Sequence, residues 1–406
     1  MAQGESDPSG HVANPEPIAS EAGQLDPYPW YREMRETNPV RCDDKRGVWD
    51  LFRFDHVERA IKDHEEFSAE SDTPFDRFKR IERIEFGDTI IASDPPTHTR
   101  LRSVVDDYFQ TGTLEEQFGA RMEELADELL DRMLAGDDEI DFMAEFAIPY
   151  PVTIIAEVLG VPTEDRDQFR EWSYQMIASP DGETEEAMRE VQRRQLEAVA
   201  NTAEYFADLV EDRKANPRDD LMTIVARSDD LARDEVLAFC VLLLMAGNIT
   251  TTNLLNNAIW MFARHGVYTD IKDGGISLRQ AVDEVLRYRS PVQSVSRATT
   301  QDVEIGGTTI PEGELVIPWI GAANRDPDVF ENPETFDPTR SPNKHMAYGR
   351  GIHTCLGAPL ANLEATTGLR AFMDRVEDVE LLADDLEPVD ARPLHSVESL
   401  PIAVTR

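Results

Sequence analysis

A ten-residue segment, 348–357, constrains this chain most, because it places three glycines and one cysteine in the order YGRGIHTCLG. The glycines let the backbone fold closely around a flat group, and the ring of Tyr348 offers a face for stacking. A helix is predicted to follow, since Pro359 suits a first helical turn and apolar residues continue with roughly helical spacing. Cys355 then precedes a helix N-terminus, where unpaired N–H groups and the helix dipole favour a thiolate.

A thiolate at this place is either a metal ligand or a nucleophile. His353 is the nearby candidate base for a nucleophile, but the sequence does not put it within hydrogen-bond reach. Zinc is disfavoured because no second cysteine or clustered histidines lie nearby. Haem iron asks the protein for only one strong axial ligand, which a single thiolate supplies. A buried cysteine in a glycine-rich turn is the alternative that these residues leave open.

The segment resembles the haem-binding loop of the cytochromes P450, the haem-thiolate monooxygenases. The resemblance implies that Cys355 is the axial ligand of haem b (iron protoporphyrin IX), with Tyr348, His353 and Gly357 in the cofactor-binding loop. That family usually has Phe where this chain has Tyr348, whose hydroxyl needs a partner if it is buried. The implied fold is α+β, mainly α with small β-sheets: a triangular helical prism with a long central helix over the haem.

The length of 406 residues and the hydrophobic content of 41% allow a large core, and length alone would allow two or three domains. The resemblance implies one domain, over residues 26–406. Residues 1–25 are rich in Pro, Gly, Ser and acid, and are expected to form a disordered acidic tail. Three scattered cysteines, no apolar run that approaches a membrane span and no signal pattern predict a cytoplasmic protein, which we expect to be a monomer.

The formal net charge of -40 argues against nucleic acid and anionic membranes as partners. Lysine is scarce, so arginine carries nearly all of the positive charge. One interpretation is a halophilic protein, whose acidic surface repels itself until counter-ions screen it. The other is an acidic protein from an arginine-rich proteome.

Residues 233–265 are predicted to form a helix about 50 Å long that crosses the centre of the molecule. Small or hydroxylic residues occupy its middle, where a core helix normally carries bulk; they are Ala246, Gly247, Thr250 and Thr251. One interpretation is a locally bent helix with threonines bonded back to its own carbonyls. The functional interpretation is that Gly247 lets a flat group approach and that Thr250 offers a hydroxyl to bound oxygen.

The chain departs from the P450 pattern at Ile249. The family usually has an acid at the position before the threonine, and an apolar side chain cannot relay the protons that oxygen cleavage needs. Either Thr250, Thr251 and water suffice, or delivery is slow. We therefore hypothesise that turnover is poorly coupled and releases peroxide.

A second motif lies between Asp94 and Arg102, where two prolines start a helix that puts His98 and Arg102 on one face. The resemblance implies that both residues, together with Arg297, hold the haem propionates. A solvated basic helix face is the alternative. The resemblance also implies that residues 67–91 cover the substrate pocket and that residues 177–184 form a mobile lid.

Glu284 and Arg287 are three residues apart in a helix that a capping box opens at residue 277. Such a pair is ordinarily a solvated ion pair of little consequence. It also resembles the buried Glu-x-x-Arg motif of the family, with Arg340 as the third partner, and its role would be structural.

The implied activity is insertion of one oxygen atom from O2 into a small, apolar organic substrate. Because no flavin or nicotinamide fingerprint is present, electrons are expected from a ferredoxin-type donor with its reductase. Arg100, Lys344 and Arg350 would offer positive charge for docking on the thiolate side. Two alternatives are a haem-thiolate enzyme of another reaction type, which Ile249 favours, and a non-catalytic haem-based small-molecule sensor or carrier, for which Thr250 is not needed.

Overall fold

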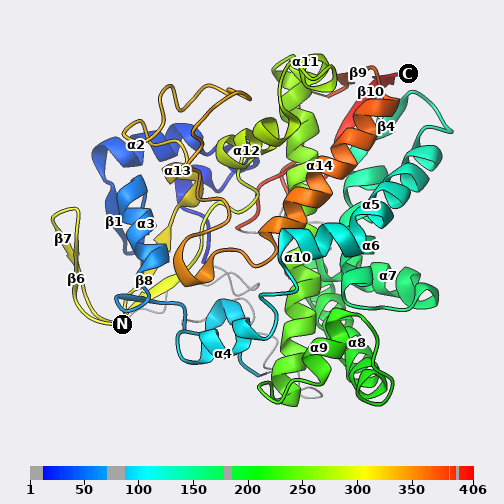
Figure 1. Cartoon of the computed structure of the whole chain (residues 1–406). Helices are drawn as coiled ribbons and strands as arrows, with labels where there is room; N and C mark the ends of the chain where they lie inside the picture. Colours follow the sequence, from blue (N-terminus) through cyan, green and yellow to red (C-terminus); the bar gives the residue numbers. More distant parts are fainter. Residues whose placement is uncertain (1–11, 71–86, 178–184, 384, 390–392) are drawn as a thin grey trace.

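The computed structural model describes residues 12–70, 87–177, 185–383, 385–389 and 393–406, which are mainly helical with small β-sheets (Figure 1). The α-helices are α1 (Glu21–Leu25), α2 (Tyr28–Thr37), α3 (Phe54–Lys62), α4 (Thr97–Ser103), α5 (Thr111–Met133), α6 (Pro149–Val158), α7 (Arg166–Ile177), α8 (Glu185–Ala215), α9 (Leu221–Ala226), α10 (Arg233–Arg264), α11 (Tyr268–Lys272), α12 (Leu278–Tyr288), α13 (Ile320–Ala323) and α14 (Ala358–Arg375). Short 3-10 or π turns are η1 (Glu16–Ile18), η3 (Ile90–Ala92), η4 (Met143–Ala147), η5 (Thr163–Asp165) and η6 (Gly351–His353). The predicted α+β class is confirmed.

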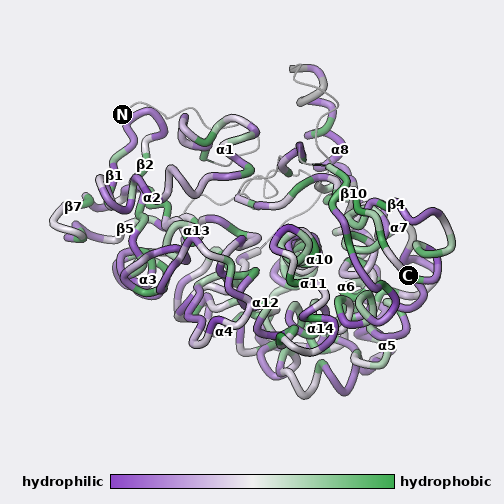
Figure 2. Tube along the Cα trace, turned by 90° about the horizontal axis from the view of Figure 1, so that it is seen from above, coloured by the Kyte–Doolittle hydropathy of each residue, from purple (hydrophilic) through white to green (hydrophobic). Residues whose placement is uncertain are grey.

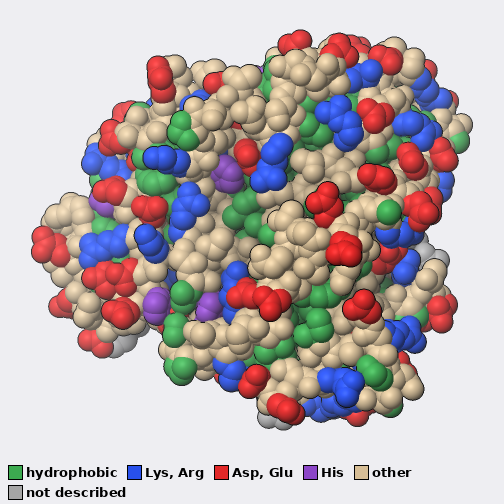
Figure 3. Space-filling view, viewed as in Figure 1, with side chains coloured by type: hydrophobic (Ala, Val, Ile, Leu, Met, Phe, Trp, Pro, Cys, Tyr) green, Lys and Arg blue, Asp and Glu red, His purple; other side chains and the backbone are tan. Residues whose placement is uncertain are grey.

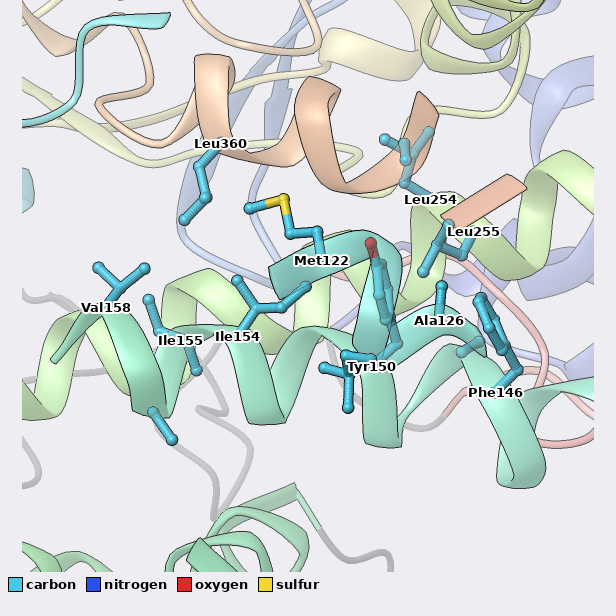
Figure 4. Packing of buried hydrophobic residues seen from close by; sticks show 14 of the residues in the cluster. Met122, Ala126, Phe146, Tyr150, Ile154, Ile155, Val158, Leu254, Leu255 and Leu360 are labelled. Atoms are coloured by element: carbon cyan, nitrogen blue, oxygen red, sulfur yellow. The ribbon is translucent and has the colours of Figure 1, made fainter. Parts of the chain in front are cut away.

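The helix α10 is the axis of the helical part and contacts α6, α8, α12 and α14 (Figures 1 and 2). It forms because Val236–Leu244 is unbroken apolar sequence, and all of these side chains are buried. Its bounds agree with the predicted helix to within one residue. Around it, α5, α6 and α14 contribute side chains such as Met122, Ile154 and Leu360 to the largest hydrophobic cluster (Figure 4).

By length and composition, α10 is also long and apolar enough to cross a membrane. The expectation that no apolar run approaches such a length is therefore wrong. The helix is this apolar because it packs in the core: 72% of its most apolar stretch is buried inside the protein.

Three small sheets lie beside the helices. The largest has the order β1-β2-β8-β5-β3 and contains β1 (Val40–Asp43), β2 (Val48–Leu51), β3 (Phe67–Ser68), β5 (Arg297–Thr299) and β8 (Leu315–Pro318). The second has the order β4-β10-β9, from β4 (Glu139–Asp141), β9 (Asp378–Leu381) and β10 (Pro401–Thr405), and the third pairs β6 (Val303–Ile305) with β7 (Thr308–Ile310). In the first sheet, β2 and β8 are parallel and the other neighbours antiparallel.

The N-terminal boundary differs from the prediction. Residues 16–25, expected to be disordered, form η1 and α1, whose N-cap Ser20 accepts a hydrogen bond from the Gly23 N–H at 3.3 Å. Ile18 is buried in a cluster with the aromatic rings of α2. This contact orders the segment despite its polar composition, because one apolar anchor removes surface from water.

Candidate active site

The middle of α10 opens where the rest of the helix is buried. Ala246 is exposed and Ile249 and Thr250 are partly exposed, while Val236–Leu244 and the residues from Thr251 to Phe262 are buried. Met245 and Gly247 are partly exposed as well, but Ile249 and Thr250 lie one helical turn after Ala246 and share its face. This accessible window lies in the part of the helix where small or hydroxylic residues replace the bulk of a core helix.

Gly247 is also partly exposed, but its missing side chain points away from the face of Ala246, Ile249 and Thr250. A Cβ at this position would lie 2.8 Å from Cδ1 of Ile155, on the α6 helix that Figure 4 shows. The glycine thus permits close packing of α6 against α10. The expectation that Gly247 admits a flat group stays a prediction, since the residue is partly exposed and its missing side chain points to α6.

Both threonine hydroxyls are bonded back to the helix. Thr250 Oγ1 donates to the carbonyl of Ala246 at 2.9 Å, and Thr251 Oγ1 donates to the carbonyl of Gly247 at 3.2 Å. These bonds are the ones expected if the threonines bond back to carbonyls of their own helix. It leaves the oxygen lone pairs of Thr250 as the groups that face the window, so this hydroxyl accepts a hydrogen bond from a molecule placed there.

Cys355 ends the turn that η6 begins, three residues before α14, as predicted. The residue is accessible, although it lies deep among protein atoms. Burial raises the pKa of the Cys355 thiol, while hydrogen bonds from the N–H groups of Gly357 and Ala358 lower it. The N–H groups at the helix N-terminus thus favour the thiolate as expected, while burial acts against them.

Tyr348 finds a partner that the sequence did not indicate. Its hydroxyl donates to Oδ1 of Asn362 at 3.2 Å, and the Asn362 amide donates to the carbonyl of Ala358 at 2.9 Å. This bond ties the start of the loop to the first turns of α14. The signal that could have found this partner is the polar Asn362, which stands between apolar residues near the start of that helix.

Three donor side chains from distant segments gather near Cys355. The rings of His98 (α4) and His353 (η6) are 4.6 Å apart, and Nε2 of neither has a hydrogen-bond partner among the described residues. Burial lowers the pKa of both histidines, that of His353 to about 3, and the Arg297 charge acts in the same direction on His353. Burial lowers the pKa of Arg297 to about 10, against the raising effect of Asp94. This cluster of buried donors is suited to a bound anion.

Arg102 is placed differently from its expected role. Its guanidinium bonds Asp106 at 2.9 Å and donates to the carbonyls of Ile352 at 3.3 Å and Thr354 at 2.6 Å. Arg102 therefore fastens α4 to the cysteine loop. The prediction that it faces the same ligand as His98 remains a prediction.

The proposed docking residues differ in their availability. Arg100 donates to both carboxylate oxygens of Glu235, at 2.8 and 2.6 Å, and to the carbonyl of Asp230. Its charge is therefore neutralised within the chain. Lys344 is exposed, and Arg350 lies 3.9 Å from a carboxylate oxygen of Glu58.

Glu284 and Arg287 form a fully buried pair on α12. Arg287 donates twice to the carboxylate at 2.8 Å, and Arg340 approaches the same carboxylate at 3.1 Å. The Asp337 N–H and the Asn343 amide complete the acceptors of Glu284, at 2.8 and 3.1 Å. The pair is therefore buried and hydrogen-bonded on all sides, and it is not the solvated ion pair that was the alternative.

The chain is similar to known proteins over most of its length. A family model described as Cytochrome P450 matches residues 277–402. The putative cytochrome P450 YjiB of Bacillus subtilis is 36% identical over 378 residues, which are 92% of each chain, and cytochrome P450 119 of Sulfolobus acidocaldarius is 34% identical over 92% of this chain and 98% of its own. A crystal structure of CYP109E1 from Bacillus megaterium with corticosterone has a TM-score of 0.84 at 35% identity, and covers 94% of this chain and 99% of its own.

The fold and the site thus define a haem-thiolate protein. The chain belongs to the cytochrome P450 family, and it is a P450 monooxygenase. Proteins of this family bind haem b, and the residues present fit that group: an accessible thiol, the donors His98, His353 and Arg297, and the window on α10. Within the described residues, no cluster of three or more His, Cys, Asp or Glu suits a separate metal ion.

Two predictions, that residues 67–91 cover the substrate pocket and that residues 177–184 form a mobile lid, stay predictions. Most of residues 67–91 and almost all of 177–184 lie outside the described residues.

Proposed function

We propose that this monooxygenase oxidises a small, apolar organic substrate with electrons from a ferredoxin-type donor and its reductase. It acts as a cytoplasmic monomer, with residues 26–406 as one domain. When bound, the haem supplies the oxygen chemistry that transfers one atom of O2 to the substrate. The single observation that carries the proposal is the convergence of Cys355 with the buried donors His98, His353 and Arg297. Nε2 of both histidines lacks a hydrogen-bond partner among the described residues, and the Asp94 carboxylate comes no closer to His353 Nε2 than 3.9 Å.

Each of these residues has one role. Cys355 would ligate the iron, Arg297 would offset the charge of the propionates, and His98 and His353 would donate hydrogen bonds to them. Arg102 is a positioning residue, since its bonds to the carbonyls of Ile352 and Thr354 hold the loop. Tyr348 and Gly357 shape the same loop.

An apolar substrate suits the window on α10. Ala246 and Ile249 present hydrocarbon there, and Met245 beside them is also partly exposed. An apolar molecule gains free energy by covering such groups, at about 25 cal/mol per Å². Solved relatives include CYP109E1 of Bacillus megaterium in complex with corticosterone and with testosterone, which supports an apolar substrate of that size class.

Electron delivery is proposed at the surface outside the cysteine loop. Lys344 is exposed there, and Arg350 is anchored by bonds to the carbonyls of Lys344 and His345 at 3.0 and 2.9 Å. Arg100 is left out of this surface, because Glu235 neutralises it. An acidic ferredoxin therefore meets these two positive charges on an otherwise acidic protein.

The test begins with the absorption spectrum of the reduced protein under carbon monoxide. A Soret band shifted strongly to the red is expected for the wild type and is expected to disappear in Cys355→Ala. Reductant-dependent consumption of O2, with an oxygenated product from a steroid probe such as testosterone, tests the reaction. A haem protein that binds testosterone yet consumes no O2 would contradict the proposal.

A further inference from the structure

The accessible face of α10 continues as a polar stripe. Counting from Ala246, the positions on this face are Thr250, Asn253 and Asn257, with Asn256 beside them. The three asparagines are at most 1% exposed, in a part of a core helix where apolar residues are the rule. We call Thr250, Asn253, Asn256 and Asn257 the α10 polar stripe.

The outer half of the stripe is bonded to neighbouring segments. Asn257 donates to the carbonyls of Arg289 and His395, at 3.2 and 2.9 Å, and accepts from Nε of Arg289 at 3.2 Å. Asn256 donates to Oγ of Ser396 at 3.2 Å. Arg289 closes the stripe, since its guanidinium lies 3.9 Å above the ring of Trp260, the next residue on this face.

Three polar atoms along this line lack a hydrogen bond to any described residue. They are Nδ2 of Asn253, Oδ1 of Asn256 and Nη2 of Arg289. Buried polar atoms are rarely unsatisfied, and water commonly bonds those that the protein leaves open. The series contains donors at both ends and an acceptor between them, a pattern that water molecules can bridge because each both donates and accepts.

The line also reaches the exterior. Nη1 of Arg289 donates at 3.1 Å to the carbonyl of Leu25, a partly exposed residue. The next residue, Asp26, is an exposed carboxylate that lies close enough to act electrostatically on Arg289. The stripe thus extends from the surface at residues 25–26 to the window at Thr250.

We propose that a file of internal water molecules runs along the α10 polar stripe from Arg289 to Thr250, with Asn253 as the positioning residue that holds the water nearest Thr250. The functional part of this inference rests on the monooxygenase activity. A proton that leaves the innermost water is replaced from the next water in the file, and bulk solvent at the outer end restores the last one. The file supplies protons by a route that does not pass through Ile249, whose apolar side chain cannot relay them.

The first test is a crystal structure of the haem-loaded protein. Ordered waters are expected at about 2.7–3.2 Å from Nδ2 of Asn253 and Oδ1 of Asn256. Electron density without a water molecule at both atoms would overturn the proposal. This result depends on no substrate and no redox partner, so it can fail while the proposed function holds.

The second test compares Asn253→Leu with Asn253→Ser. Leu removes the amide and expels the water, which strands Oδ1 of Asn256, so the unfolding midpoint is expected to fall. If the amide is dry, Leu removes an unsatisfied group and the midpoint rises instead. Ser keeps a hydroxyl and leaves room for water. If Asn253→Leu does not fold, Asn253→Val takes its place.

The third test measures how the electrons are used without added substrate, with NADH, a surrogate ferredoxin and its reductase. Asn253→Leu is expected to raise the ratio of peroxide to water about fivefold, the factor that corresponds to loss of one ordinary hydrogen bond. Asn253→Ser should keep the wild-type ratio. Thr202→Val is the matched control, since Thr202 on α8 is buried and its hydroxyl also lacks a described partner. A wild-type ratio in Asn253→Leu refutes the role of Asn253, while no O2 consumption by wild type refutes the proposed function.

Discussion

The side chains of Glu284 and Arg287 meet in a double hydrogen bond, and neither exposes any surface to solvent. Arg287 also donates to the carbonyls of Asn324 and Pro333, at 3.0 and 2.8 Å, and to the carbonyl of Thr335 at 3.0 Å. The pair therefore connects α12 to the segment that precedes the cysteine loop. Its desolvation is offset only while every one of these bonds is made.

Replacement of Glu284 by Gln is expected to destabilise the fold by about 3–5 kcal/mol, because it leaves the buried Arg287 charge uncompensated. Urea unfolding followed by circular dichroism measures this change. The control is Arg279→Gln on the same helix, whose pair with Asp283 at 3.4 Å is largely exposed on the arginine side. Its cost is expected to stay below about 1 kcal/mol. Equal costs for the two variants would contradict the argument.

The Tyr348 hydroxyl gives a second prediction. Tyr348→Phe removes the bond to Asn362 and leaves Oδ1 of Asn362 without its donor, at an expected cost of about 1 kcal/mol in unfolding free energy. The double variant Tyr348→Phe/Asn362→Leu removes both polar partners and should recover most of that loss. The red-shifted carbon monoxide band should persist in both. A double variant less stable than the single one would show that Asn362 has another role.

Much of the fold was predictable because its signals are local. The long apolar run of α10, the serine cap at residue 277 and the alternation of residues 303–320 each define an element from neighbouring residues alone. The N-terminal segment was not predictable in this way. Its order depends on burial of Ile18 against rings of α2, a contact that composition does not reveal.

The site was predictable by residue type more than by contact. Cys355 and the helix after it are encoded within ten residues, but Gly247 faces Ile155 and Arg100 pairs with Glu235 across 135 residues. Such pairings depend on how helices pack, which no local pattern specifies. The stripe from Asn253 to Asn257 was visible as asparagine in a core helix, and only the burial and the missing partners gave it meaning.

Ile249 gives a prediction about coupling. Ile249→Glu places a titratable group one residue before Thr250 and is expected to lower the fraction of electrons released as peroxide, because a carboxyl can relay protons. Ile249→Gln has nearly the same shape without the acid and is the control. Peroxide assays under steady electron supply from NADH compare the variants. Equal or greater leakage in Ile249→Glu would mean that the proton supply does not limit turnover.

The ion pair between Arg100 and Glu235 predicts a dependence of stability on acid. Hydrogen bonds from Arg100, and next the N–H of Ala232, hold the pKa of Glu235 below its usual value of 4.5, although burial raises it. Stability from a lowered carboxylate pKa is complete above about pH 4.5 and is lost as pH falls through the folded-state value. Wild type should therefore exceed Glu235→Gln in unfolding free energy at pH 7, and the two should converge below pH 4.5. Asp234→Asn, in the same helical turn, controls for loss of one charge, and curves that stay parallel would refute the assignment.

The acidic surface gives the last prediction. The chain has 80 acidic and 40 basic side chains, and Figure 3 shows acidic groups spread over the whole visible face with basic ones among them. At low ionic strength this excess repels itself, and at 1 M salt the screening length shrinks to about 3 Å. If the protein is halophilic, the unfolding midpoint should rise steadily from low to multimolar potassium chloride. Screening alone saturates near a few tenths molar, so a gain that stops there would indicate an ordinary acidic protein, and no gain would remove the hypothesis. Potassium sulfate at matched ionic strength separates this effect from the general strengthening of apolar burial, which sulfate increases more than chloride.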